Sequence, residues 1–94
     1  MLLAIDVGNT NSKFVVFDGD RIVAQWRLRT EAKRTADEYA AWLIQLMNVQ
    51  GFDPRSITGA ILASVVPRLT GAFEEMIQRR FDLEPVEHQL RGAN

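Results

Sequence analysis

The sequence predicts an α/β fold in which a mixed β-sheet carries helices. Short apolar or alternating segments fill the first third of the chain, and two later segments show helical periodicity. A fully apolar run lies between these helical segments, as in a central parallel strand that is buried on both faces. With 94 residues, of which 47% are hydrophobic, the chain has enough apolar material for the core of one small domain.

Three short segments at the start predict a β-meander. Residues 2–7 are an apolar run, and residues 12–18 are rich in Phe and Val. Residues 18–20 (Asp-Gly-Asp) are typical of a hairpin turn, so the strands on either side are predicted to be antiparallel. Every second residue beyond that turn is apolar, and we expect these residues on one half-buried face: Ile22, Ala24, Trp26 and Leu28.

A capping box predicts the start of the first helix. Thr35 is the N-cap and Glu38 stands three residues later, so each side chain can bond the backbone N–H of the other. Gly51 is placed to end this helix. Its apolar face follows the helical spacing: Tyr39, Trp42, Leu43, Leu46 and Met47.

The second half of the chain predicts a strand, a helix and a last extended segment. Residues 60–66 are apolar on both faces, and Pro67 ends this strand and opens a helix. One side of that helix carries Leu69, Phe73, Met76, Ile77 and Arg80, with Phe81 at the end of the buried face. Residues 85–88 are predicted to be extended and residues 90–94 to be a loose end. The order β-β-β-α-β-α-β is that of a ribonuclease H-like layout.

Composition excludes several classes of function. Eleven basic residues against twelve acidic ones, a net charge of −1, give no electrostatic footprint for nucleic acid. The absence of cysteine excludes a disulfide framework and a thiolate metal site. Asp6 interrupts the first apolar run after a few residues, so we expect no signal peptide, no membrane span and a cytoplasmic location.

The candidate functional site is the turn between the first two predicted strands. Asp6 ends an apolar strand, where its carboxylate can hold a magnesium ion directly or through water. Gly8 lets the backbone come close to a phosphate, and exposed N–H groups in such a turn form an anion-binding nest. The predicted phosphate contacts are Asp6, Gly8, Asn9, Thr10, Asn11 and Lys13.

Alternative interpretations remain open at this point. A plain β-turn explains the same residues equally well, since turns commonly contain Asp, Gly and Asn. The position of Asp6 favours function, because a carboxylate in a buried strand needs a partner. Residues 64–67 (Ser-Val-Val-Pro) follow a central strand and are the second candidate location. For His88 we expect a surface or packing role, and the basic residues Arg27, Arg29, Lys33 and Arg34 are expected to be mainly a solvated connector.

Four segments together resemble the amino-terminal part of type III pantothenate kinase, over the chain to about Val86. They are residues 6–11 (Asp-Val-Gly-Asn-Thr-Asn), 18–20, 34–39 (Arg-Thr-Ala-Asp-Glu-Tyr) and 64–67. The resemblance implies the acetate and sugar kinase, Hsp70 and actin superfamily, with two ribonuclease H-like domains. Members are bacterial, cytoplasmic, usually dimeric enzymes that phosphorylate pantothenate with ATP in the first step of coenzyme A synthesis. They use a divalent cation such as Mg²⁺ and a monovalent cation, K⁺ or NH₄⁺.

The match also implies roles for individual residues. Asp6 would hold Mg²⁺ through water and Lys13 would contact phosphate. The other residues of the turn, Gly8, Asn9, Thr10 and Asn11, would line the phosphates. The family's catalytic aspartate belongs to a G-x-D-R motif that these 94 residues do not contain. We therefore expect residues 1–94 to be the first, incomplete domain of a longer kinase, inactive alone, with the catalytic residue downstream of Asn94.

Two other functions compete with the kinase. The same family includes relatives that act as accessory factors in transcription, so the chain could instead be a non-catalytic binding module. Nucleases of the same fold also begin with an apolar strand that ends in D-x-G. They need further acids to hold a second metal ion, and residues 64–67 at the end of the central strand contain none.

Overall fold

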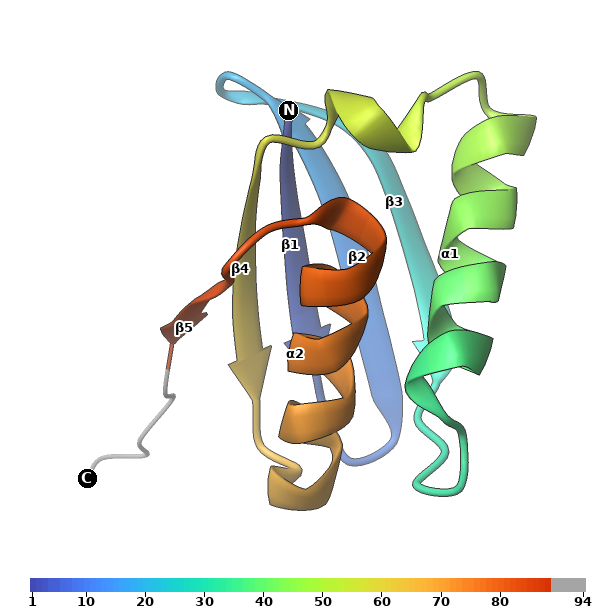
Figure 1. Ribbon diagram of the computed structural model, residues 1–94, viewed down its shortest axis with the longest axis vertical. Helices are drawn as coiled ribbons and strands as arrows, with labels where there is room; N and C mark the ends of the chain where they lie inside the picture. The colour runs from blue at the N-terminus through green and yellow to red at the C-terminus, as the bar shows by residue number, and fades with distance from the viewer. Residues whose placement is uncertain (89–94) are drawn as a thin grey trace.

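The computed structural model describes residues 1–88 as a five-stranded mixed sheet with two α-helices packed on one face (Figure 1). The elements are β1 (Leu2–Val7), β2 (Asn11–Asp18), β3 (Arg21–Arg29), α1 (Ala36–Val49), the 3₁₀ turn η1 (Pro54–Ser56), β4 (Gly59–Ser64), α2 (Pro67–Phe81) and β5 (Val86–His88). This order confirms the predicted sequence of strands and helices. The loose end predicted for residues 90–94 lies outside the described residues.

The sheet has the strand order β3-β2-β1-β4-β5. β1 is antiparallel to β2 and β2 is antiparallel to β3, which confirms the meander. β1 is parallel to β4 and β4 is parallel to β5. The carboxyl ends of β1 and β4 therefore meet at one end of the sheet, where both helices also begin (Figure 1, lower end).

Aromatic side chains form the centre of the core between the sheet and the helices. Phe14 of β2 is fully buried, with its ring 5.0 Å from that of Trp42 in α1 and 5.9 Å from that of Phe73 in α2. Tyr39 of α1 closes the group, at 4.4 Å from Phe73. These tilted ring pairs bind both helices to the sheet, since aromatic contacts add to the stability that burial gives.

The opposite face of the sheet, which we call the open face, carries no helix from residues 1–88 (Figure 1). The strand register and the alternation of burial place on it Ala4, Asp6, Lys13, Val15, Phe17, Ile22, Gln25, Arg27, Ile61 and Ala63. Most of the central positions are small or apolar and half-buried, whereas the charged residues gather toward one end. No helix among residues 1–88 combines the length and the apolar character that crossing a membrane requires.

The prediction that Ile22 shares a half-buried face with Ala24, Trp26 and Leu28 is wrong for Ile22. The register of β2 against β3 shifts between Val16 and Phe17, because a β-bulge adds one residue to β3. Ile22 therefore pairs with Phe17 instead of following the alternation of Ala24 and Trp26, and it is 58% exposed. The extra residue, Val23, puts the side chains before it on the opposite face from the one that the alternation of Ala24 and Trp26 would give them.

The helix ends follow the predicted signals. Thr35 accepts a hydrogen bond from the Glu38 N–H (3.2 Å), and Glu38 accepts one from the Thr35 N–H (2.8 Å), which confirms the capping box. Gly51 follows α1 with a φ of 85°, a left-handed conformation that favours glycine. Arg80 of α2 pairs with Asp37 of α1 at 2.7 Å and ties the two helices at the surface.

Replacing Thr35 by alanine is expected to lower the free energy of unfolding by about 1 kcal/mol, because the first turn of α1 loses its side-chain acceptor. Urea unfolding followed by circular dichroism measures the change. Glu38→Gln is the matched control, since glutamine keeps an oxygen that can accept the Thr35 N–H. Equal stabilities of Thr35→Ala and the unmodified chain would show that the cap contributes nothing.

Candidate functional site

The turn after β1 is closed by its own backbone. The Gly8 N–H donates to the Asn11 carbonyl oxygen at 3.0 Å. A Cβ atom at Gly8 would lie 2.9 Å from that same oxygen, so a side chain there would force the turn apart. Asn9 and Thr10, between these residues, are exposed. The glycine is therefore required by the close approach of two backbone segments within the turn itself.

Asp6 lies on the open face at the end of β1, beside Lys13 in the register of β1 and β2. Its side chain is exposed, so the expectation that the strand buries this carboxylate is wrong. The physical reason is the alternation of the strand: Ile5 and Val7 face the helices, and Asp6 between them faces away. Burial therefore does not argue for a function of Asp6, but an exposed carboxylate is free to take a metal ion.

Two hydroxyl residues fix the turn to the connector that follows β3. The Thr30 N–H donates to the Thr10 carbonyl oxygen at 2.8 Å, and the Ser12 and Thr30 hydroxyls are 2.7 Å apart. Ser12 is fully buried. Sequence analysis missed both residues as supports of the turn. The available signal was the alternation along β2. Every second side chain of this strand faces the helices, which places the polar Ser12 on the same buried face as Phe14.

The segment after β4 lies directly beside the turn. The Val65 N–H donates to the Val7 carbonyl oxygen at 3.0 Å, which continues the pairing of β1 and β4 by one residue. The Ser64 hydroxyl bonds both the N–H (3.1 Å) and the carbonyl oxygen (3.2 Å) of Val66, and so fixes the bend before Pro67. The structure thus brings together the two locations that sequence analysis singled out.

The basic residues divide into two groups. Arg27 stands directly opposite Lys13 across β2 and β3, and both side chains are exposed. Arg34 instead donates to the Arg29 carbonyl oxygen (3.3 Å) and lies 5.8 Å from the centre of the Tyr39 ring, a cation–π contact. The connector is therefore partly ordered by its own contacts. His88, on β5, is paired in register with Ala63 at the far side of the sheet from these residues.

The turn can supply only some of the ligands of a divalent ion, so such an ion would be shared between the protein and a bound phosphate. Within residues 1–88, no group of three or more His, Cys, Asp or Glu side chains is placed to hold a metal. Mg²⁺ commonly takes one or two carboxylates and completes its shell with phosphate oxygens and water. The exposed carboxylate of Asp6, next to backbone N–H groups and the Lys13 ammonium, suits such an ion.

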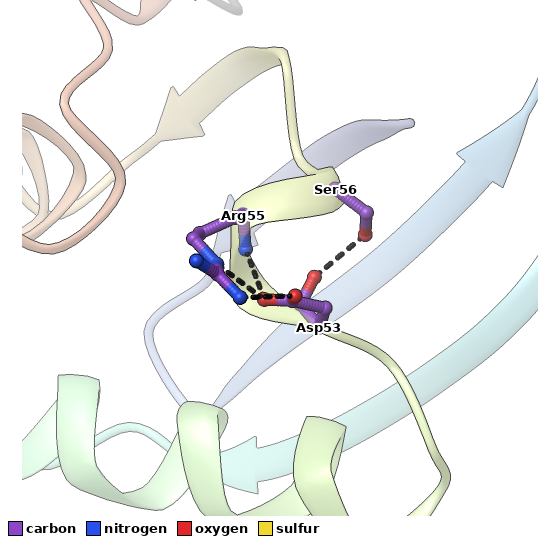
Figure 2. Close-up of polar contacts among 3 residues, drawn as sticks. All are labelled: Asp53, Arg55 and Ser56. Carbon is purple, nitrogen blue, oxygen red and sulfur yellow. Dashed lines mark hydrogen bonds and ion pairs between the residues drawn. The ribbon is translucent and has the colours of Figure 1, made fainter.

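A second polar cluster lies at the other end of the sheet and has a structural role (Figure 2). Asp53 accepts from the Arg55 N–H at 2.9 Å and pairs with its guanidinium at 3.1 Å, while the Ser56 hydroxyl donates to the Asp53 carbonyl oxygen. The side-chain hydrogen bond from Arg55 holds the pKa of Asp53 below its usual value of 3.8. Because the folded pKa is lowered, this contribution to stability is present at neutral pH and is lost as the pH falls through that pKa.

The fold is that of the actin-like and sugar kinase ATPases. A protein from Porphyromonas gingivalis, described as a candidate N-acetylglucosamine kinase, superposes with a TM-score of 0.65 over 95% of this chain and 34% of its own, at 14% identity. The Ppx/GppA phosphatase of Aquifex aeolicus superposes with a TM-score of 0.50 over 95% of this chain and 35% of its own, at 16% identity. At these identities the likeness shows the fold alone.

Sequence comparison gives the family. The sequence model of the type III pantothenate kinase family matches residues 2–93, which is nearly the whole chain. The chain therefore belongs to that family. The type III pantothenate kinase of Rhodospirillum centenum is 50% identical over 86 residues, which are 92% of this chain and 33% of the relative. That of Rhizorhabdus wittichii is 51% identical over 84 residues, 89% of this chain and 32% of the relative. The chain thus spans about a third of the length of these relatives.

Proposed function

We propose that this chain is the first phosphate-binding domain of a type III pantothenate kinase, which transfers a phosphoryl group from ATP to pantothenate in coenzyme A synthesis. The observation that carries the proposal is the turn at Gly8, closed by its own backbone between Asp6 and Lys13, in a chain whose family match covers it. Phosphoryl transfer depends mainly on positioning and on neutralising charge, and this turn offers both.

Each residue of the turn has a distinct role in the proposal. Asp6 holds Mg²⁺ through water, and the ion neutralises charge on the phosphate oxygens when it is bound. Gly8 keeps the turn narrow, and the Lys13 ammonium meets a phosphate as a point charge. The remaining contacts come from backbone and side-chain donors of Asn9, Thr10 and Asn11.

Further features are carried over from the family and rest on the resemblance alone. These are the catalytic aspartate and a second ribonuclease H-like domain beyond residue 94, a monovalent cation (K⁺ or NH₄⁺), a homodimer and a cytoplasmic location. Because it holds only the first of the two proposed domains, the 94-residue chain by itself is expected to form no phosphopantothenate.

A chimera tests the proposal. The matched 86 residues of this chain replace the corresponding segment of the Rhodospirillum centenum enzyme, with which they share 50% identity. The chimera is expected to form phosphopantothenate from ATP, and Asp6→Asn is expected to lower the rate at least 100-fold, since the metal loses its carboxylate. Product formation is measured by mass spectrometry.

Asp20→Asn is the matched control, because it makes the same chemical change on an exposed residue of the β2–β3 hairpin, at the opposite end of the sheet. It is expected to leave the rate within twofold of the unmodified chimera. A folded chimera without activity, or one in which both substitutions have the same effect, contradicts the proposed function.

A further inference from the structure

A row of charged residues crosses the open face next to the turn. The register places Asp6 opposite Lys13, and Lys13 opposite Arg27. All three side chains are exposed, and alternation puts them on the same side of the sheet. Directly opposite residues on adjacent strands have Cβ atoms about 5 Å apart, so the two cations are neighbours.

Neither cation forms an ion pair among the described residues, although Asp6 stands opposite Lys13 in the register. Across residues 1–88, the ion pairs are Arg55–Asp53, Arg79–Glu75 and Arg80–Asp37, and none involves Lys13 or Arg27. Like charges placed directly opposite each other destabilise a strand pair. An anion bound between them would relieve that repulsion, which is a reason for such a pair to exist beside a phosphate turn.

A depression accompanies the pair. It has a volume of about 250 Å³ and is lined by Lys13, Gln25, Trp26 and Arg27. The carboxamide of Gln25 can donate two hydrogen bonds. Trp26 pairs in register with Phe14, so its indole lies on the helix-covered face and not in the depression. The side chains that face the depression from the open face are therefore Lys13, Gln25 and Arg27, whose N–H donors suit an anion.

We propose that Arg27 and Lys13 together bind a phosphate group of a polyphosphate chain, which runs from the turn at Gly8 onto the open face of β2 and β3. Arg27 grips two oxygens of that group with its planar guanidinium, and Lys13 neutralises its charge. This inference rests on the proposed function, because Lys13 belongs to the turn, and adds Arg27 and the depression to the phosphate site.

Nuclear magnetic resonance titration of the 94-residue chain with sodium tripolyphosphate at low salt tests the inference. The side-chain amide signals of Gln25 and Gln45 are assigned by substituting each residue with methionine. The Gln25 signals are expected to shift with saturation, because this exposed side chain lines the depression on the open face. The Gln45 signals are expected to stay in place, because Gln45 lies in α1, which packs on the other face of the sheet.

Arg27→Gln is expected to weaken tripolyphosphate binding about tenfold, because a charge-assisted bidentate contact is lost. Arg21→Gln is the matched control. It removes the same charge from the same strand at the hairpin end, where Arg21 pairs in register with Asp18, and is expected to change the affinity less than twofold. Circular dichroism of both variants checks that the exposed substitutions leave the fold intact.

Three results would overturn the inference: no binding by the unmodified chain, unmoved Gln25 signals at saturation, or equal affinities of Arg27→Gln and Arg21→Gln. The outcome is separable from that of the proposed function. If Lys13→Gln abolishes binding while Arg27→Gln does not, the role of Arg27 fails and the turn still binds phosphate. If binding depends on Arg27 but the chimera is inactive, the anion site stands and the kinase function fails.

Discussion

Replacing Phe14 by alanine is expected to destabilise the folded chain by about 3–5 kcal/mol. The ring is fully buried and lies within 5.9 Å of the aromatic rings of both helices, so its removal leaves a cavity where β2, α1 and α2 meet. Small domains have a total stability of about 5–15 kcal/mol, so a loss of this size removes a large fraction of the stability of the folded chain. Urea unfolding followed by circular dichroism measures the loss.

Ile22→Ala provides the comparison for Phe14→Ala. It also removes a large apolar side chain from the meander, but the β-bulge leaves Ile22 58% exposed on the open face. The expected loss is less than about 1 kcal/mol, since little packing is removed. Similar losses for the two variants would mean that the aromatic group is not the centre of the core.

Replacing Gly8 by alanine is expected to lower the rate of the chimera about 100-fold while leaving most of its stability. The new Cβ atom would lie 2.9 Å from the Asn11 carbonyl oxygen, so the Gly8–Asn11 hydrogen bond must lengthen and the turn must open. A displacement of about 1 Å in a phosphate-positioning group is enough for a loss of this size. Phosphopantothenate formation and thermal unfolding, measured on the same sample, separate the two effects.

Gly71→Ala is the control for Gly8→Ala. Gly71 lies in α2, where an added Cβ meets no atom within 4 Å, and alanine favours a helix. The control is expected to keep its activity and to gain up to about 1 kcal/mol of stability. Retained activity of Gly8→Ala would show that the narrow turn is not needed for phosphate positioning.

The regular elements were predictable from the sequence because burial repeats along each of them. Period two in β1 and β2, helical spacing in α1 and α2, and the Thr35–Glu38 capping box all act within a few residues. The bulge opposite Val16 and Phe17 leaves only a weak local signal: Val23, the extra residue, interrupts the alternation from Arg21 to Leu28, and one apolar residue does not show which side chains change face. The position of Ile22 therefore became visible only in the strand register.

The candidate site also has a part that the sequence could predict and a part that it could not. The turn from Asp6 to Lys13 is continuous in the sequence, so its composition could suggest phosphate binding directly. The contact of Val65 with Val7, the hydroxyl pair of Ser12 and Thr30, and the alignment of Arg27 with Lys13 join residues that are distant along the chain. Such contacts depend on which strands pair and in which register, and no short motif encodes them.

The position of β1 in the middle of the sheet has a consequence for how the site forms. Its hairpin partner β2 follows immediately, but its parallel partner β4 pairs Gly59 with Leu2, so the chain must close a long loop before the second contact exists. The meander can thus form early in folding. The contact between Val7 and Val65, at the carboxyl ends of β1 and β4, forms only when β4 pairs with β1. A ligand that contacted both the turn and the segment after β4 would bind the complete sheet and not the meander alone, so its binding would shift the folding equilibrium toward the complete sheet.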